Sequence, residues 1–274
     1  GAAVADPIGL LGGTGNIALG SGAMGVALTS GTDNVAIGEN ALDAVTTGTD
    51  NTGVGDNAAG AVSTGADNTA VGSGALLTED TGTRNTAVGS TALGTLNYDG
   101  AGYNTAVGYA AGTGITTGIL NTAVGGLALD ASTIGRYNTA LGYQSLSTDI
   151  DGDYSTAIGY QALTTQESDG ANQAVYNTAV GASAGSGLTT GIGNTIVGAL
   201  ALDATVTGDN NTALGYRALT TNTSGAQNTG LGKDALYSNT VGLYNTAVGE
   251  GALYTNVDGS NSVAVGRLAL YTQD

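Results

Sequence analysis

The sequence predicts an all-β fold, a parallel β-solenoid of about fifteen coils with a 17-residue period. The phrase NTAVG occurs six times, beginning at Asn68, Asn85, Asn104, Asn121, Asn177 and Asn245. The glycine that closes each phrase or near-copy, called the anchor glycine, recurs at a spacing of 17 residues in eleven of fourteen intervals. The anchors are Gly20, Gly38, Gly55, Gly72, Gly89, Gly108, Gly125, Gly142, Gly159, Gly181, Gly198, Gly215, Gly232, Gly249 and Gly266. Two glycines in every period, with many threonines, disfavour helices and leave short strands.

The tripeptide Thr-Ala-Val before each anchor is the first predicted strand. Its alternation places Thr and Val on one face of the strand and Ala on the other. The Val position holds only Val, Ile or Leu, and the Thr position accepts Ile17, Val35 and Val263. We therefore expect the Thr and Val side chains to point inward. The core column predicted on this basis includes Val71, Val88, Val107, Val124, Leu141 and Val180.

A segment that usually reads Ala-Leu follows each anchor, with Leu in eleven of the fifteen coils, and predicts a second short strand in every coil. Its leucines form a further core column, which includes Leu42, Leu76, Leu163 and Leu219. Each coil then has about three medium-sized apolar side chains, too few to form a core alone, so the coils must stack.

Glycine and asparagine are predicted to form the corners of the coil. The glycines supply a positive φ where the chain turns sharply. The asparagine that opens each phrase tolerates the left-handed conformation, and its stacked copies can form an amide ladder. Length varies in one part of the coil only, with the longest insertions at Leu96–Tyr103 and Thr164–Tyr176.

The repeats define one domain, residues 16–274, preceded by residues 1–15, a predicted cap or linker that contains Pro7. The chain stops half a coil after Gly266. An open sheet edge there invites pairing, so we expect the chain to be either a fragment of a longer fibre or a subunit that stacks end to end into a filament.

Two columns of small residues also bear on assembly. Ala precedes the Leu in fourteen of the fifteen coils, and Ala or Gly fills the middle of the first strand in fourteen. Such uniform smallness indicates a backbone packed closely against these residues. That backbone belongs either to another subunit or to the opposite wall of the same coil.

Composition excludes several classes of partner and activity. With 22 acidic and 5 basic residues, the formal charge is −17, which opposes binding to nucleic acid or anionic membranes. No stretch approaches the roughly 18 apolar residues that span a bilayer. The chain has no Cys or His, and Lys233 is its only lysine. We therefore expect no membrane insertion and no enzymatic activity.

One acidic stretch resembles the start of a calcium-binding loop. In the sequence DIDGD, Asp149, Asp151 and Asp153 have the spacing of the first loop ligands. Tyr160 stands where a twelve-residue loop would place its bidentate Glu. We therefore interpret the stretch as an acidic turn and expect no cofactor, with calcium as the alternative.

The 13 tyrosines gather mainly in the central coils, beside the long insertions. Exposed tyrosines can form a contact surface for a protein or a glycan. Alternatively, they stack on one another from coil to coil. The candidate contact residues are Tyr98, Tyr103, Tyr109, Tyr137, Tyr143, Tyr160 and Tyr176.

The phrases NTAVG, NVAIG at Asn34–Gly38 and NTAVGEGALYTN at Asn245–Asn256 resemble the YadA-like head repeat of trimeric autotransporter adhesins. They are also similar to repeats of phage tail-fibre proteins. The resemblance covers residues 16–270 and implies a left-handed parallel β-roll, a trimer and a role in surface attachment, on a cell or a virion.

The expected function is therefore that of a non-enzymatic extracellular fibre segment, attaching to a host surface protein or glycan. A subunit that stacks end to end into a filament is the alternative. Ice binding by the threonine array is a minor alternative, disfavoured because the threonines are expected to point inward.

Overall fold

The computed structural model describes residues 14–25, 28–168, 170 and 173–272. The predicted cap at residues 1–15 lies almost wholly outside the described residues, as does part of the insertion Thr164–Tyr176. Within the described part of the chain, no helix has the length and hydrophobicity needed to cross a bilayer.

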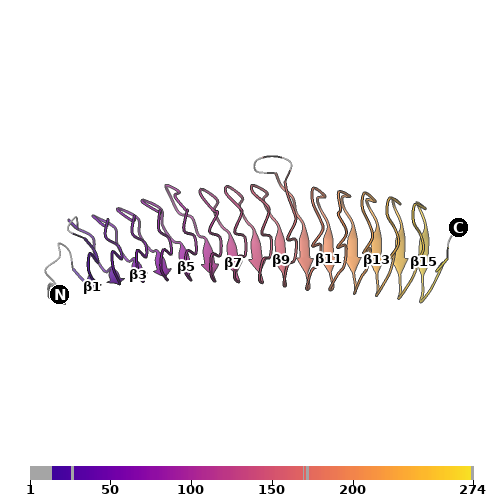
Figure 1. The fold of residues 1–274 in the computed structure, drawn as a ribbon. Helices are drawn as coiled ribbons and strands as arrows, with labels where there is room; N and C mark the ends of the chain where they lie inside the picture. Colours follow the sequence, from indigo (N-terminus) through magenta and orange to yellow (C-terminus); the bar gives the residue numbers. More distant parts are fainter. Residues whose placement is uncertain (1–13, 26–27, 169, 171–172, 273–274) are drawn as a thin grey trace. The chain divides into compact units, whose positions relative to one another are not determined.

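The fold is an all-β parallel solenoid, as predicted, with one three-residue strand in each coil (Figure 1). The strands are β1 (Ile17–Leu19), β2 (Val35–Ile37), β3 (Thr52–Val54), β4 (Thr69–Val71), β5 (Thr86–Val88), β6 (Thr105–Val107), β7 (Thr122–Val124), β8 (Thr139–Leu141), β9 (Thr156–Ile158), β10 (Thr178–Val180), β11 (Thr195–Val197), β12 (Thr212–Leu214), β13 (Thr229–Leu231), β14 (Thr246–Val248) and β15 (Val263–Val265).

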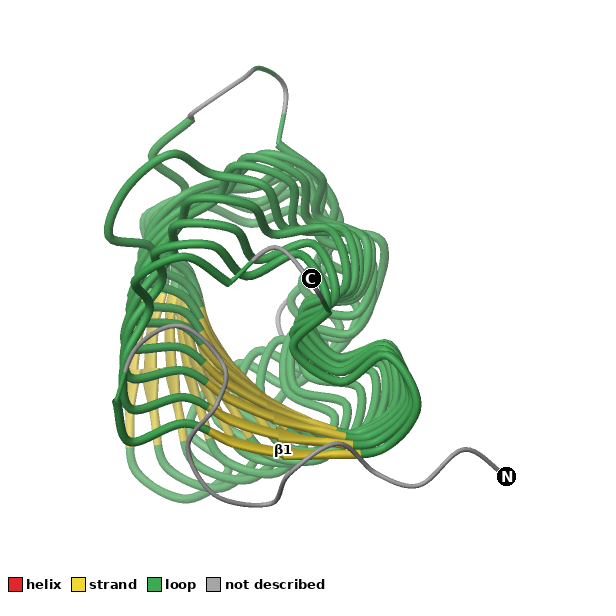
Figure 2. Cartoon of the chain, turned by 90° about the vertical axis from the view of Figure 1, so that its left-hand side faces the viewer, coloured by secondary structure: helices red, strands yellow, loops and turns green. Residues whose placement is uncertain are grey.

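The chain divides into two compact units, Gly1–Arg136 with β1 to β7 and Tyr137–Asp274 with β8 to β15. Within each unit, consecutive strands pair in parallel and in register, so that Val71 lies opposite Val88 and Thr178 lies opposite Thr195. The strands form one wall of each coil and loops form the others (Figure 2). In-register pairing explains the repetition of the phrase, because each residue packs against its own copy in the next coil.

The predicted second strand is absent from every coil. The segment that contains the Ala-Leu pair forms tight turns and not a strand. Its leucine has a positive φ, as at Leu42 (φ 50°) and Leu163 (φ 50°). Coil-to-coil hydrogen bonds persist there, since the Leu76 amide donates to the Ala92 carbonyl (2.9 Å). The four predicted core residues of this column are fully buried and are confirmed as core: Leu42, Leu76, Leu163 and Leu219.

A positive φ explains which residues this position accepts. β-Branched side chains strongly disfavour the left-handed region. The four coils without Leu have Met24, Ala59, Gly112 and Gly185, none of which is β-branched. Backbone conformation therefore selects Leu over Val and Ile in this column.

The prediction that the Val column is core is wrong. The middle residue is buried in β2 to β15 and half-buried in β1, and the first and third residues are half-buried or exposed. The misplaced core residues are Val71, Val88, Val124 and Val180, which are half-buried, and Val107 and Leu141, which are exposed. Alternation shows which side chains share a face of a strand, but it does not show which face is inward.

The inward face is narrow, which explains the small residues on it. A Cβ added to Gly53, in the middle of β3, would lie 2.9 Å from the Ala58 carbonyl oxygen and 3.1 Å from Leu42 Cγ. Both columns of alanines thus pack against walls of the solenoid interior. This packing decides between the two interpretations of their smallness: the crowding is within the solenoid, and not against another subunit.

The one large residue in the middle column compensates for a missing leucine. Ile196 replaces Ala in β11, next to the coil in which Gly185 replaces Leu. A Cβ at Gly185 would lie 2.8 Å from Ile196 Cδ1, so the isoleucine occupies the volume that leucine fills elsewhere. Interior volume is therefore conserved between neighbouring coils.

The two glycines of each coil have different roles. Anchor Gly89 has φ +133°, and an added Cβ would lie 2.2 Å from the Gly108 carbonyl oxygen. Gly48, from the second glycine column, lacks a positive φ; there a Cβ would lie 2.5 Å from the Gly65 carbonyl oxygen. The second column is thus explained by close approach of coils, and the prediction of positive φ fails at Gly48. The asparagine that opens each phrase does not have a positive φ; the residue before it does, as at Asp50 (φ 59°).

Leu163→Ile tests the role of backbone conformation in the core. Because Ile is β-branched, the substitution should lower the free energy of unfolding by about 1–2 kcal/mol more than the same substitution at a site without a positive φ. Leu188→Ile is the matched control, since Leu188 is also fully buried but has no positive φ. Urea unfolding gives both free energies, and equal losses would contradict the assignment.

Candidate functional site

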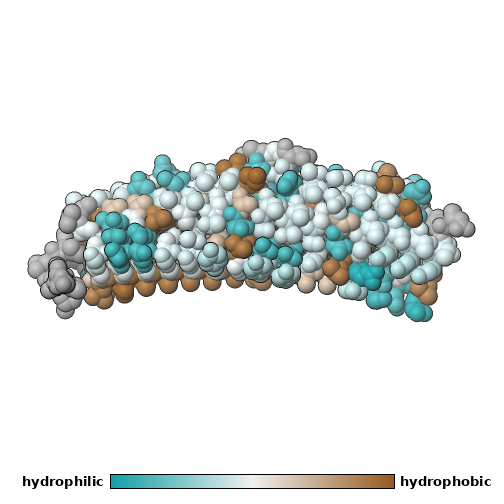
Figure 3. Space-filling view, in the orientation of Figure 1, coloured by the Kyte–Doolittle hydropathy of each residue, from teal (hydrophilic) through white to brown (hydrophobic). Residues whose placement is uncertain are grey.

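The first and third side chains of the strands form the outward face of each unit. In the first unit this face includes Val107, 37% exposed, and in the second it includes Leu141, 46% exposed. A row of apolar side chains runs along the edge where β1 to β7 lie (Figure 3). The exposed large apolar members are Ile17, Leu19, Ile37, Val107, Leu141, Leu214, Leu231, Val263 and Val265.

No charged residue occupies either column of the outward face in any of the fifteen coils. Charges stand instead at the positions that flank the strands. Arg84 and Asp67, each directly before an asparagine, form an ion pair (3.4 Å). Lys233 and Glu250, each directly after an anchor glycine, form another (3.7 Å). An apolar strip with a charged rim is the pattern of a protein–protein interface.

Sequence reasoning missed this face, although a signal for it was present. The uniformly small residues at the middle of the strand could have identified the crowded, inward side. The aliphatic columns would then have been placed outside, and their lack of charge would have stood out.

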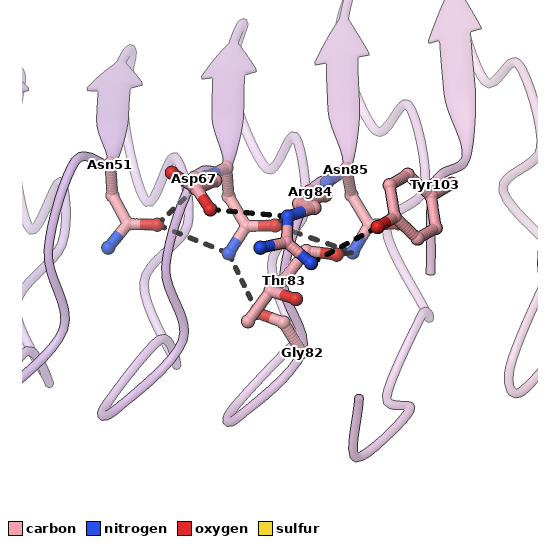
Figure 4. A network of polar contacts seen from close by, with 8 residues as sticks. Asn51, Asp67, Gly82, Thr83, Arg84, Asn85 and Tyr103 are labelled. Atoms are coloured by element: carbon pink, nitrogen blue, oxygen red, sulfur yellow. Dashed lines mark hydrogen bonds and ion pairs between the residues drawn. The ribbon is translucent and has the colours of Figure 1, made fainter. Parts of the chain in front are cut away.

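A ladder of buried asparagines positions the strands, as the sequence predicted. In the first unit, Asn51 Oδ1 accepts a hydrogen bond from the Asn68 backbone amide (3.1 Å), and Asn68 Oδ1 accepts from the Asn85 amide (3.0 Å). Asn68 Nδ2 donates to the Gly82 carbonyl oxygen at the facing corner (2.8 Å; Figure 4). One side chain thus ties its own coil both to the next strand and to a glycine corner.

In the second unit, Ser155 and, in the last coil, Ser262 replace the ladder asparagine, and neighbouring side chains fill the gap at Ser155. Ser155 stands at the asparagine position and donates its backbone amide to Asn138 Oδ1 (2.8 Å). Gln166 Nε2 donates to Ser155 Oγ (2.9 Å) and to Asp149 Oδ2 (2.7 Å). Asn177 Nδ2 donates to Gln166 Oε1 (3.0 Å), which continues the network.

The three aspartates of the calcium-loop motif do not form a metal site. Asp149 is buried and accepts hydrogen bonds from Gln166 and from the Gly152 amide, while Asp151 accepts one from Ser168. Within the described ranges, no group of three Asp, Glu, His or Cys side chains is arranged to hold a metal ion. The predicted acidic-turn interpretation fits this arrangement.

Two buried carboxyl groups have raised pKa values. Burial raises the pKa of Asp149, and the hydrogen bonds from Gln166 and Gly152 oppose this shift. Burial likewise raises the pKa of Glu79, against hydrogen bonds from the Gly82 and Tyr98 amides. Both residues occupy the buried position three residues after the Ala-Leu pair, where other coils have Val45, Leu96 or Asn222.

Four of the seven candidate tyrosines lie in ring stacks, the arrangement that the second of the two interpretations predicted: Tyr137, Tyr143, Tyr160 and Tyr176. Tyr154 lies between Tyr137 (ring centroids 4.7 Å apart) and Tyr176 (5.2 Å), and Tyr143 stacks with Tyr160 (5.9 Å). Tyr103 and Tyr109 are exposed, and Tyr98 is half-buried. No ring stacks on these three among the described residues, although the Arg84 guanidinium lies over Tyr103 (5.6 Å) and donates to its hydroxyl (3.1 Å).

Comparisons with known proteins found no match to this chain, either among protein-family models or among curated proteins.

Asp149→Asn should increase stability at neutral pH. A carboxyl group whose pKa is raised on folding contributes stability that is present below its unfolded pKa and is lost as pH rises through its folded pKa. Asn does not ionise, so the variant does not lose stability at this site as pH rises. Asn also fits the site, because Asn222 at the same position of another coil donates from Nδ2 to the Gly225 carbonyl oxygen (2.8 Å).

The measurement is thermal melting from about pH 4 to pH 8, a range chosen to cover raised carboxyl pKa values. The variant should melt above the wild type at the upper end of this range, and the two curves should converge at the lower end. Asp258→Asn, at an exposed carboxylate of the same unit, removes the same charge and is the charge-matched control. A lower melting temperature for Asp149→Asn at neutral pH would contradict the assignment.

Proposed function

We propose that this chain is a non-enzymatic segment of an extracellular fibre that associates side by side through its outward face and mediates surface attachment. The observation that carries the proposal is the charge-free outward face of the strands, on which a column of Val, Ile and Leu side chains lies beside a column of mostly Thr side chains. Monomeric soluble proteins rarely expose extended apolar patches of this kind, and those that do usually bind a partner there.

A second copy of the chain is the occupant that fits this face. The face is a regular series of β-branched and aliphatic side chains. The same series on a second copy can interdigitate with it. The ion pairs at its rim, Arg84 with Asp67 and Lys233 with Glu250, offset part of the negative charge beside the apolar columns. The resemblance to trimeric adhesin heads supports three copies.

Attachment to a host protein or glycan would use the surfaces that self-association leaves exposed. Tyr109 and Tyr244, more than half exposed and without a stacked ring in the described chain, are suitable contacts because their rings are both apolar and polar.

End-to-end assembly into a filament is the alternative proposal. It would pair β1 of one copy with β15 of another and would not use the outward face. Substitutions on that face would then leave assembly unchanged.

Ice binding is a second candidate because the threonines do not point inward, which was the argument against it. Thr69, Thr86 and their equivalents lie on the outward face and not in the core. A regular array of threonine hydroxyl and methyl groups on a sheet is the feature such binding would need. Ice binding requires that no other copy covers the outward face. A monomeric protein that shows thermal hysteresis would therefore favour ice binding over self-association.

The pair Val107→Lys and Leu141→Lys should dissociate the assembly, because each places a charge in an apolar interface. Mass photometry should show oligomers of one defined mass for the wild type and monomers for the double variant. The control pair, Leu77→Lys and Ile150→Lys, adds the same charge at exposed apolar residues outside the outward face and should remain oligomeric.

A monomeric wild type would contradict self-association. Open-ended oligomers that persist in the Val107→Lys, Leu141→Lys variant would favour the filament. Circular dichroism should show that both double variants keep the wild-type fold.

A further inference from the structure

Eight of the 13 tyrosines stand in stacks that connect consecutive coils. In addition to Tyr137, Tyr154 and Tyr176, a second stack of three contains Tyr237, Tyr254 and Tyr271, with both centroid separations at 4.9 Å. The rings are nearly parallel, with angles of 4° between Tyr137 and Tyr154 and 7° between Tyr237 and Tyr254. Tyr143 and Tyr160 form the remaining pair.

These stacks are accessible to a reagent. Tyr137, Tyr154 and Tyr176 are each at least 43% exposed, and Tyr271 is also exposed. Their ring faces cover one another, so they offer edges and hydroxyl groups to solvent and not open faces for a sugar ring. The stacks are therefore better suited to a reaction between neighbouring tyrosines than to a platform for a ligand.

Composition directs one-electron oxidation to these tyrosines. The chain has no Cys, Trp or His, and its single methionine, Met24, is fully buried. The phenols are consequently the only readily oxidised side chains at the surface of the described chain.

We propose that the stacked tyrosines are sites of oxidative cross-linking, in which a peroxidase and hydrogen peroxide join consecutive coils by dityrosine bonds. Each of two phenols loses one electron and its hydroxyl proton, which gives two phenoxyl radicals. The radicals couple through a carbon–carbon bond between ring carbons next to the hydroxyl-bearing carbons. The hydrogen on each of these carbons then moves to the oxygen, and both rings regain aromaticity.

The balance of the reaction is complete with hydrogen peroxide as the oxidant. The two electrons and two protons from the tyrosines reduce one hydrogen peroxide to two water molecules. The coil-to-coil stacking supplies the proximity, since two rings held together by the fold react far more readily than two that must meet by diffusion. Each bond adds a covalent link between coils that otherwise depend on hydrogen bonds and packing.

This inference does not depend on self-association, because both partners of every stack belong to one chain. The test treats the dilute, full-length protein with horseradish peroxidase and hydrogen peroxide. Dityrosine fluorescence is then measured in the monomer band of a denaturing gel. Mass spectrometry of peptides should find pairs that are two hydrogen atoms lighter than their sum, joining Tyr154 or Tyr254 to a stacked neighbour.

The decisive variant is Tyr154→Phe with Tyr254→Phe, which keeps the rings but removes the phenols from four of the five stacked pairs. Its fluorescence should fall to about one third of the wild-type value, because each stack of three rings forms one bond and only the Tyr143–Tyr160 pair remains in the variant. The control, Tyr103→Phe with Tyr244→Phe, removes two tyrosines without a stacked ring in the described chain and should react like the wild type.

Three results would overturn the proposal. They are equal fluorescence from the two double variants, cross-links formed chiefly between chains, and an equal yield from the urea-unfolded protein. Unchanged circular dichroism and melting of the Phe variants would show that the loss of fluorescence reflects chemistry and not unfolding.

Discussion

Within each unit, buried side-chain amides connect consecutive coils, and the rest of the structure depends on this connection. In each unit, an asparagine oxygen accepts the backbone amide of the residue at the same position one coil later, as Asn194 does for Asn211 (2.9 Å). Because the asparagines are buried, an unpaired amide would be costly, and this fixes the register of the coils. Where Ser155 interrupts the series, Gln166 supplies the missing amide.

Register in turn fixes what the interior can hold. Coils that match residue for residue leave a narrow space, which small strand residues, alanines and leucines fill. Gly185 and Ile196 show that a volume lost from one coil is restored by its neighbour. Since the small side of each strand faces this space, its aliphatic side is left at the surface. The outward face is thus a consequence of interior packing.

The sequence was sufficient to predict the repeat, the parallel in-register stacking and the amide ladder, because each follows from the 17-residue spacing. It did not show the direction of the strand faces, since Thr86 and Val88 alternate with Ala87 in the same way whichever side is buried. It also did not show that Leu42 is left-handed, because an apolar residue in a short repeat is equally typical of a strand. Both errors concern orientation, which depends on packing across the coil, and the missed outward face follows from the first.

Hydrogen exchange of asparagine side-chain amides, followed by NMR on asparagine-labelled protein, tests the central claim most directly. The account predicts that ladder residues such as Asn51, Asn68 and Asn194 exchange slowly, at rates comparable to those of the strand backbone amides. The exposed Asn97 and Asn210 should exchange rapidly in the same sample. Equally rapid exchange at all five positions would contradict the claim that buried amides hold the coils in register.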